Sequence, residues 1–178
     1  GTITATQGAL YVQYIANSQY TSADNYTTVN FSSDGFYSGP LADLQKIIDV
    51  APEVVSHNIE TVRRVSREVR KQAKYDRSLE VLFRLKKGGM RTKSGFMVGL
   101  GESEEEVFET IDDLAAVNVE IITIGQYLQP TPGHLEIVKF ITPEKFEEYR
   151  QYALSKGFRH VESSPLVRSS YHAEKHIH

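Results

Sequence analysis

The fold is decided by residues 95–124, GFMVGLGESEEEVFETIDDLAAVNVEIITI. The first six of these residues are an apolar run that predicts a buried strand. Ser103 and Glu106 then match a capping box, which marks the start of a helix. Residues 119–124 are nearly all apolar and β-branched, as expected of a strand covered on both faces. A strand, a helix and a second strand in this order predict one parallel βαβ unit.

The same alternation continues on both sides of this unit. The apolar spacing and the turn residues predict four more helices, over residues 41–50, from Thr61 to about residue 71, from residue 76 or 78 to residue 88, and over residues 142–157. They also predict strands over residues 53–58 and 158–163. The sum is about four parallel strands with intervening helices. This pattern belongs to the α/β class and predicts a partial, half TIM-type barrel.

The first 38 residues have a different composition from the rest. They hold only two charged side chains, Asp24 and Asp34, and Tyr, Thr, Ser and Asn dominate. Such a composition favours strands and turns. We expect strands over residues 9–16 and 26–31 that form a β-hairpin or are added to the sheet. The chain therefore divides into a β segment, residues 1–38, and a half barrel, residues 39–178.

Charge and cysteine content exclude several classes of protein. The 178 residues carry 20 Lys and Arg against 23 Asp and Glu, and they contain no cysteine. This chain therefore has no disulfide, no thiol nucleophile and no thiolates for a zinc or iron–sulfur site. A formal net charge of −3 argues against nucleic-acid binding. Without an apolar run of membrane-spanning length or a signal-peptide pattern, we expect no membrane span and a cytoplasmic protein.

Polar and glycine residues cluster where the predicted strands end, at residues 57–61, 99–103, 125–130 and 168–171. Ligands of such folds bind at the carboxyl ends of the strands, so this rim is the expected site. Glu60 has two interpretations, as an acceptor for ribose hydroxyls or as a carboxylate at a helix start. The turn with Gly99 and Gly101 is either a close backbone approach to a ligand or a tight connection. His57 either touches a ligand or is a buried histidine bonded to backbone.

Six motifs follow one another along the chain: HNIETV (57–62), YDRSL (75–79), TKSG (92–95), MVGLGE (97–102), TIGQYLQP (123–130) and PLVRSSYH (165–172). In order and spacing they resemble the carboxyl-terminal half of lipoyl synthase, over about residues 39–173. Six ordered motifs make this resemblance far more specific than a single glycine pattern.

The resemblance implies a radical S-adenosylmethionine enzyme that inserts two sulfur atoms into an octanoyl chain on a carrier protein. That family uses S-adenosylmethionine and two four-iron four-sulfur clusters. By this resemblance Ser170 is an iron ligand of the auxiliary cluster, and Arg168 positions its segment. The S-adenosylmethionine site is implied to include Asn58, Glu60, Lys93, Ser94, Gly99, Gly101, Glu102, Gly125 and Gln126.

The chain departs from the family at the clusters, because it lacks the CxxxCxxC motif and the second set of three cysteines. We therefore expect a truncated or chimeric, catalytically inactive fragment that binds no cluster, with Ser170 acting as a loop hydroxyl. One alternative is a weak module for S-adenosylmethionine or a nucleoside. The other is a scaffold without a ligand that associates with itself through exposed strand edges. The basic stretch at residues 63–74 either faces an acidic carrier protein or is a solvated helix face.

Overall fold

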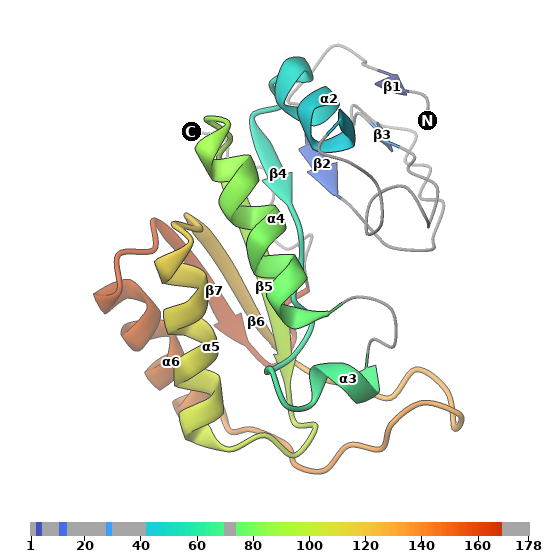
Figure 1. Ribbon diagram of the computed structural model, residues 1–178. Coiled ribbons are helices and arrows are strands. Elements are labelled where there is room, and N and C mark those ends of the chain that lie inside the picture. Colours follow the sequence, from blue (N-terminus) through green and yellow to red (C-terminus); the bar gives the residue numbers. More distant parts are fainter. Residues whose placement is uncertain (1–2, 5–10, 14–27, 30–41, 70–73, 169–178) are drawn as a thin grey trace.

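The computed structural model describes residues 3–4, 11–13, 28–29, 42–69 and 74–168. Its main feature is a parallel sheet in the order β2-β4-β5-β6-β7 (Figure 1). The strands are β2 (Tyr11–Gln13), β4 (Val54–Ser56), β5 (Thr92–Val98), β6 (Ile121–Gln126) and β7 (His160–Ser164). The four strands β4 to β7, with a helix following each of the first three, confirm the predicted half barrel.

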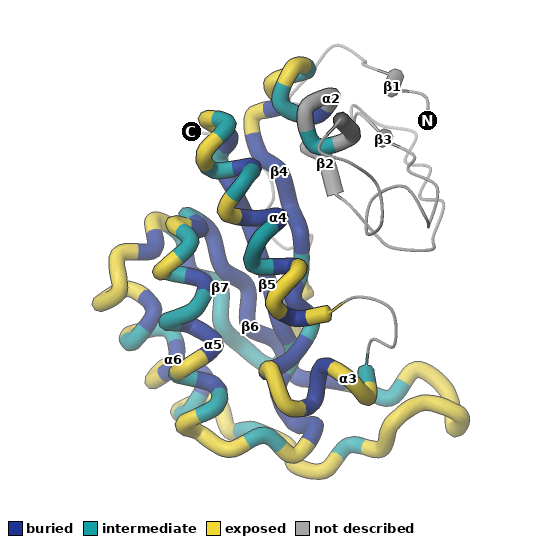
Figure 2. The backbone as a smooth tube through the Cα atoms, viewed as in Figure 1, coloured by how far each residue is buried: buried dark blue, intermediate teal, exposed yellow. Residues whose placement is uncertain are grey.

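Helices cover one face of this sheet. Figure 1 shows α4 (Tyr75–Lys87), α5 (Glu104–Ala116) and α6 (Pro143–Ser155) side by side on that face. The main core lies between them and the sheet, where Phe96, Ile124 and Ile111 are at most 3% exposed. Figure 2 shows the central strands buried along their length, while the segment between β6 and α6 is largely exposed. The carboxyl end of β6 and this exposed segment together form one rim of the molecule.

The helix starts predicted at Ser103 and Thr142 are confirmed. The Ser103 hydroxyl accepts from the Glu106 N–H at 3.3 Å, and the Glu106 carboxylate accepts from the Ser103 N–H at 2.8 Å. Thr142 caps α6 in the same way, with its hydroxyl 3.3 Å from the Lys145 nitrogen. Caps satisfy N–H groups that a helix start would leave without partners, so their sequence pattern is local and easily recognised.

The helix predicted to begin at Thr61 is wrong in its start. Only α3 (Ser66–Val69) is helical between Thr61 and residue 69. Thr61 is fully buried, and its N–H donates to the carbonyl of Ile59. Because the preceding Glu60 still bridges to Phe96 of β5, the chain follows the sheet for longer than the sequence pattern indicated.

Of the described amino-terminal strands, one joins the parallel sheet and the other two pair with each other. β2 pairs in parallel with β4, with Tyr11 opposite Val54 and Gln13 opposite Ser56. β3 (Thr28–Val29) pairs antiparallel with β1 (Ile3–Thr4). The described strands within 9–16 and 26–31 therefore form no hairpin together, and β2 extends the parallel sheet instead. Helix α2 (Ala42–Val50) precedes β4.

Candidate functional site

A pocket of about 120 Å³ opens on the sheet face opposite α4, α5 and α6, near the carboxyl ends of β4, β5 and β6. We call it the sheet-face pocket. Asn58 and Glu60 reach it from the segment after β4, Thr123 from β6, and Val167 and Arg168 from the segment after β7. The remaining lining residues, on β5 and β6, are Gly95, Phe96, Met97 and Gly125. Four residues implied by the resemblance therefore meet here: Asn58, Glu60, Gly125 and Arg168.

Two glycines make the floor of the sheet-face pocket. A Cβ atom added to Gly95 would lie 2.2 Å from the Thr123 hydroxyl oxygen, and one added to Gly125 would lie 2.4 Å from the Val167 carbonyl oxygen. Neither position accepts a side chain without movement of its neighbours. The glycines therefore let the Thr123 side chain approach β5 closely and let the 165–168 segment approach β6 closely at this pocket.

Glu60 enters the sheet-face pocket from an uncommon backbone conformation. Its φ angle is 70°, in the left-handed region that side chains other than glycine seldom adopt. The conformation is fixed from both sides, because the Glu60 N–H donates to the Gly95 carbonyl at 3.2 Å and the Glu60 carbonyl accepts from the Met97 N–H at 2.8 Å. Strained residues of this kind concentrate at functional sites. Glu60 and Arg168 give the pocket one negative and one positive side chain.

Lys93 and Ser94 lie in β5 but do not line the sheet-face pocket. Both are completely buried. Lys93 stands opposite Ser56 of β4 and Ile121 of β6 in the sheet register. Among the described residues the Ser94 hydroxyl has no hydrogen-bond partner. The structure thus places these two residues next to Gly95 in β5 but outside the lining of the pocket.

The turn after β5 is held together by its own atoms. The Glu102 carboxylate accepts from the Gly99 N–H at 2.5 Å and from the Leu100 N–H at 2.9 Å. Gly99 and Gly101 have φ angles of 103° and 95°, which favour glycine. None of these residues lines the sheet-face pocket. In this structure the interpretation of this turn as a tight connection has direct geometric support.

The Gln126 side chain forms hydrogen bonds with the long segment between β6 and α6, residues 127–142. We call this segment the rim loop. The side-chain amide of Gln126 donates to the carbonyls of Tyr127 and Lys139, both at 3.1 Å, and accepts from the Ile141 N–H at 2.9 Å. The Gly99 carbonyl accepts from the N–H groups of Val138 and Lys139. The Gln126 side chain is therefore fully used by the protein's own backbone. A buried amide at the end of an apolar strand was the available sequence signal, because such a group needs partners.

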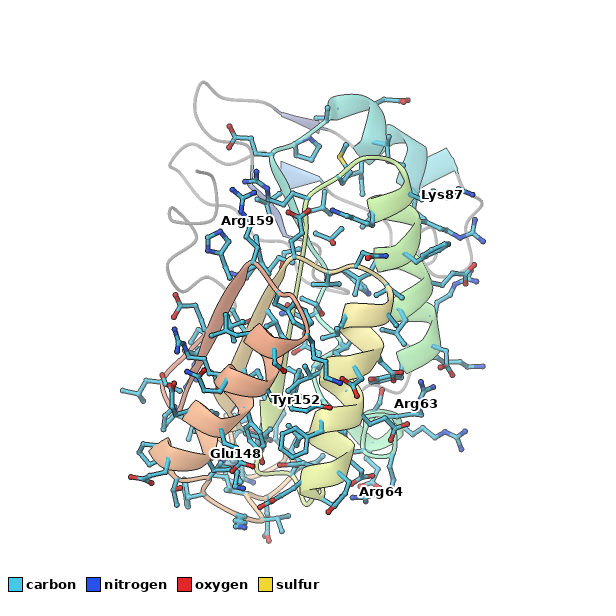
Figure 3. The ribbon with its side chains drawn as sticks, turned by 90° about the vertical axis from the view of Figure 1, so that its left-hand side faces the viewer. Arg63, Arg64, Lys87, Glu148, Tyr152 and Arg159 are labelled. Atoms are coloured by element: carbon cyan, nitrogen blue, oxygen red, sulfur yellow. The ribbon has the colours of Figure 1, made fainter. Side chains whose placement is uncertain are left out.

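Arg64 contacts the turn after β5, and the sequence did not identify it as a residue of this region. Its guanidinium contacts both carboxylate oxygens of Glu106, at 2.8 and 2.9 Å, and the Gly101 carbonyl at 2.8 Å. This side chain ties the turn after β5 to the segment after β4 (Figure 3). The neighbouring Arg63 pairs with Asp76 and Asp113 and lies over the Tyr75 ring. Two members of the basic stretch thus have carboxylate partners within the chain.

The donor set does not fit an iron–sulfur cluster. The sequence has no cysteine, and the part of the chain that the structure describes contains no group of three His, Cys, Asp or Glu able to hold a metal ion. Ser170, the implied iron ligand, lies outside the described residues. Arg168 donates to the Val167 carbonyl at 2.9 Å. The sheet-face pocket instead combines an amide, a carboxylate and a guanidinium, on Asn58, Glu60 and Arg168.

No helix in the described ranges is long and apolar enough to cross a membrane. His57 is 1% exposed, and its N–H donates to the Lys93 carbonyl, so it belongs to the buried strand region rather than to the lining of the sheet-face pocket.

Comparisons with known proteins identify relatives of this chain. The chain is 62% identical over 142 residues to a lipoyl synthase of Flavobacterium johnsoniae, covering 79% of this chain and 49% of that protein. It is 62% identical over 143 residues to a mitochondrial lipoyl synthase of Nematostella vectensis, covering 80% of this chain and 49% of that protein. The chain thus spans about half the length of the curated relatives it matches.

A solved structure of Streptococcus suis SuiB bound to S-adenosylmethionine shares the fold, with a TM-score of 0.56 at 11% identity. The matched region covers 75% of this chain and 32% of the SuiB chain. The sequence profile of the Radical SAM superfamily matches residues 5–114, which is more than half of the chain. The chain therefore belongs to the Radical SAM superfamily, and lipoyl synthases are among its relatives.

Proposed function

We propose that this chain is the carboxyl-terminal half of a lipoyl-synthase-like barrel and that its sheet-face pocket binds the nucleoside part of S-adenosylmethionine weakly. The observation that carries this proposal is that Glu60, held in a strained conformation, meets Asn58 and Arg168 at one pocket. A carboxylate can accept from two ribose hydroxyls, while an amide and a guanidinium can donate to ring nitrogens. A cytoplasmic location is part of the same proposal.

The size of the pocket limits what it holds. A volume of about 120 Å³ is below the range of roughly 300–1,000 Å³ typical of ligand pockets. We therefore assign one ring of the nucleoside to it, with the rest of the ligand outside. S-adenosylmethionine supplies an adenosyl group in the chemistry of this superfamily. The residues of this chain bind and orient that group, and no reaction step is assigned to them.

Titration calorimetry with S-adenosylmethionine and with 5′-deoxyadenosine tests this proposal. We expect a dissociation constant in the high micromolar to millimolar range, and at least fivefold weaker binding by Glu60→Gln. Glu109→Gln is the matched control, because Glu109 is exposed on α5 and is not part of the pocket lining. An absence of heat with both ligands, or equal affinities of Glu60→Gln and the unchanged chain, contradicts the proposal.

Sulfur insertion into a protein-bound octanoyl chain is proposed only for an assembly in which other residues supply the thiolates. The chain spans about half of its relatives, which supports a missing part of this size. Reconstitution of these 178 residues alone with iron and sulfide should leave the visible spectrum without the broad absorbance of a cluster. The appearance of that absorbance would show that this chain holds a cluster by itself.

A second candidate function is a self-associating scaffold. Among the described strands, β2 and β7 each pair with one neighbour in the parallel sheet, so both present an edge. Unpaired strand edges are templates for association. Sedimentation velocity should then show a discrete dimer or larger species whose population rises with concentration. A single monomeric species at every concentration would remove this candidate.

A further inference from the structure

A second and larger cavity lies at the rim, away from the sheet-face pocket. Its volume is about 370 Å³, and it is lined by the turn after β5, the first turns of α5 and α6, and the end of the rim loop. We call it the rim cavity. It shares no lining residue with the sheet-face pocket. Its size falls within the usual range for small-molecule sites, roughly 300–1,000 Å³.

Tyr149 of α6 lines the rim cavity with an unusual hydroxyl. The residue is only 2% exposed, and its ring packs edge-on against Phe108 and Phe146, with centroid distances of 5.7 and 6.4 Å. Buried tyrosine hydroxyls normally have a hydrogen-bond partner. Within the described ranges the Tyr149 hydroxyl makes no hydrogen bond, and the residue is part of the cavity lining. The ring is therefore fixed by packing, and its donor is left for a ligand.

This hydroxyl stays protonated at neutral pH. Burial, and then the nearby Glu104 carboxylate, raise the pKa of Tyr149 to about 12. The group is thus a neutral donor in the pH range in which a carboxylate ligand is ionised and accepts hydrogen bonds.

The charges that line the rim cavity balance. Two are positive, Lys139 and Lys145, and two are negative, Glu102 and Glu104. Lys145 already pairs with Glu104 at 3.1 Å and with Glu148 at 2.5 Å. Lys139 makes no ion pair within the described part of the chain. The lining therefore offers one available cation together with carboxylates, and a doubly charged anion such as phosphate would face two like charges.

Apolar side chains complete the wall. Val138 and Ile141 of the rim loop line the cavity next to Tyr149. At the two helix starts, the Ser103 and Thr142 hydroxyls accept from the Glu106 and Lys145 N–H groups. A ligand for this space thus needs a small apolar part, one negative group and one positive group.

We propose that the rim cavity binds a small zwitterion of the α-amino acid class. The carboxylate of the ligand accepts from the Tyr149 hydroxyl and pairs with Lys139. The ammonium of the ligand faces Glu102 and Glu104, and its side chain lies against Val138 and Ile141. This assignment uses residues of the rim that the nucleoside proposal does not use, so the two proposals stand or fail separately.

The test is ligand-observed NMR on the full 178-residue chain with the twenty common amino acids, in the absence of nucleoside. We expect millimolar binding by at least one amino acid with an apolar side chain. The amide and the deaminated acid of the best binder should bind at least tenfold more weakly, because each lacks one charge. No binding by any amino acid, or equal binding by the deaminated acid, overturns the proposal.

Variants then locate the binding. Tyr149→Phe and Lys139→Gln should each weaken the best amino acid at least fivefold. Tyr152→Phe is the matched control. The Tyr152 hydroxyl donates to Asp112 at 3.0 Å, and Figure 3 shows this side chain between α5 and α6. The Tyr152→Phe variant should bind the amino acid as the unchanged chain does. Thermal unfolding of Tyr149→Phe should match the unchanged chain, since no hydrogen bond is lost. Equal binding by Tyr149→Phe and Tyr152→Phe overturns the assignment, whereas Glu60→Gln should leave amino acid binding unchanged.

Discussion

The sheet-face pocket and the turn after β5 both contain residues that the resemblance implied to bind the cofactor, but the two regions are built differently. At the turn, Glu102 and Gln126 spend their side chains on backbone N–H and carbonyl groups of the chain itself. At the pocket, Glu60, Asn58 and Arg168 line a cavity beside Gly95 and Gly125. Polar residues at strand ends can therefore bind the chain's own backbone or line a cavity, and Glu102, which also lines the rim cavity, does both.

This difference has an energetic side. The turn and the rim loop are joined by hydrogen bonds in both directions, through the Gln126 amide and through the Gly99 carbonyl. Removing such a partner leaves buried groups unsatisfied, which costs stability. Substitution of a residue that lines the sheet-face pocket should be seen in nucleoside binding. Substitutions in the two regions should therefore separate stability from affinity.

The largest effect is expected at Gln126. Gln126→Ala removes two donated hydrogen bonds and one accepted hydrogen bond of a 3% exposed side chain, and should lower the free energy of unfolding by about 3 kcal/mol. Urea denaturation measures this change. Gln129→Ala is the control, because its single exposed hydrogen bond to His134 should be worth about 0.5 kcal/mol or less. Equal losses for the two variants would contradict the scaffold role of Gln126.

Gly125→Ala should affect both stability and binding. The new Cβ atom would meet the Val167 carbonyl and displace the 165–168 segment, at a cost of about 2 kcal/mol. Nucleoside binding should fall at least tenfold, because this segment carries Arg168 into the pocket wall. Gly133→Ala, where an added Cβ would lie 3.9 Å from the Thr131 hydroxyl oxygen, should leave both quantities unchanged. Unchanged nucleoside binding by Gly125→Ala would place the ligand elsewhere.

The smallest effect is expected from Arg64, and it should depend on pH. The Arg64 guanidinium, followed by the Ser103 N–H, holds the pKa of Glu106 below its usual range. A carboxylate whose pKa is lowered in the folded state adds stability above its unfolded pKa of about 4.3, and this stability is lost as the pH falls through the folded pKa. Urea denaturation should therefore show Arg64→Gln slightly less stable than the unchanged chain at pH 7.

The same two proteins should approach equal stability at pH 3, because Glu106 is then largely protonated. The exposed position of Arg64 makes this contribution small and sensitive to salt. A difference that persists unchanged from pH 7 to pH 3 would show that the ion pair with Glu106 does not cause it.

Much of the fold follows from local sequence signals. Ser103 and Thr142 identify their helices within four residues, and the apolar run that ends at Gln126 identifies its strand. The start predicted at Thr61 failed because Glu60 pairs with a strand 36 residues further along, which no local pattern reveals. The site residues divide in the same way: Glu60 and Gly125 meet only through strand pairing, and the role of Gln126 depends on the path of the rim loop.

The central claim is that the pocket, and not the turn, is the binding surface for a nucleoside. Amide chemical shifts of the full chain during titration with 5′-deoxyadenosine test it directly, because glycines mark both places. We predict saturable shifts at Gly95 and Gly125 and much smaller shifts at Gly99 and Gly101. Saturable shifts confined to Gly99 and Gly101, with Gly95 and Gly125 unmoved, would contradict this account.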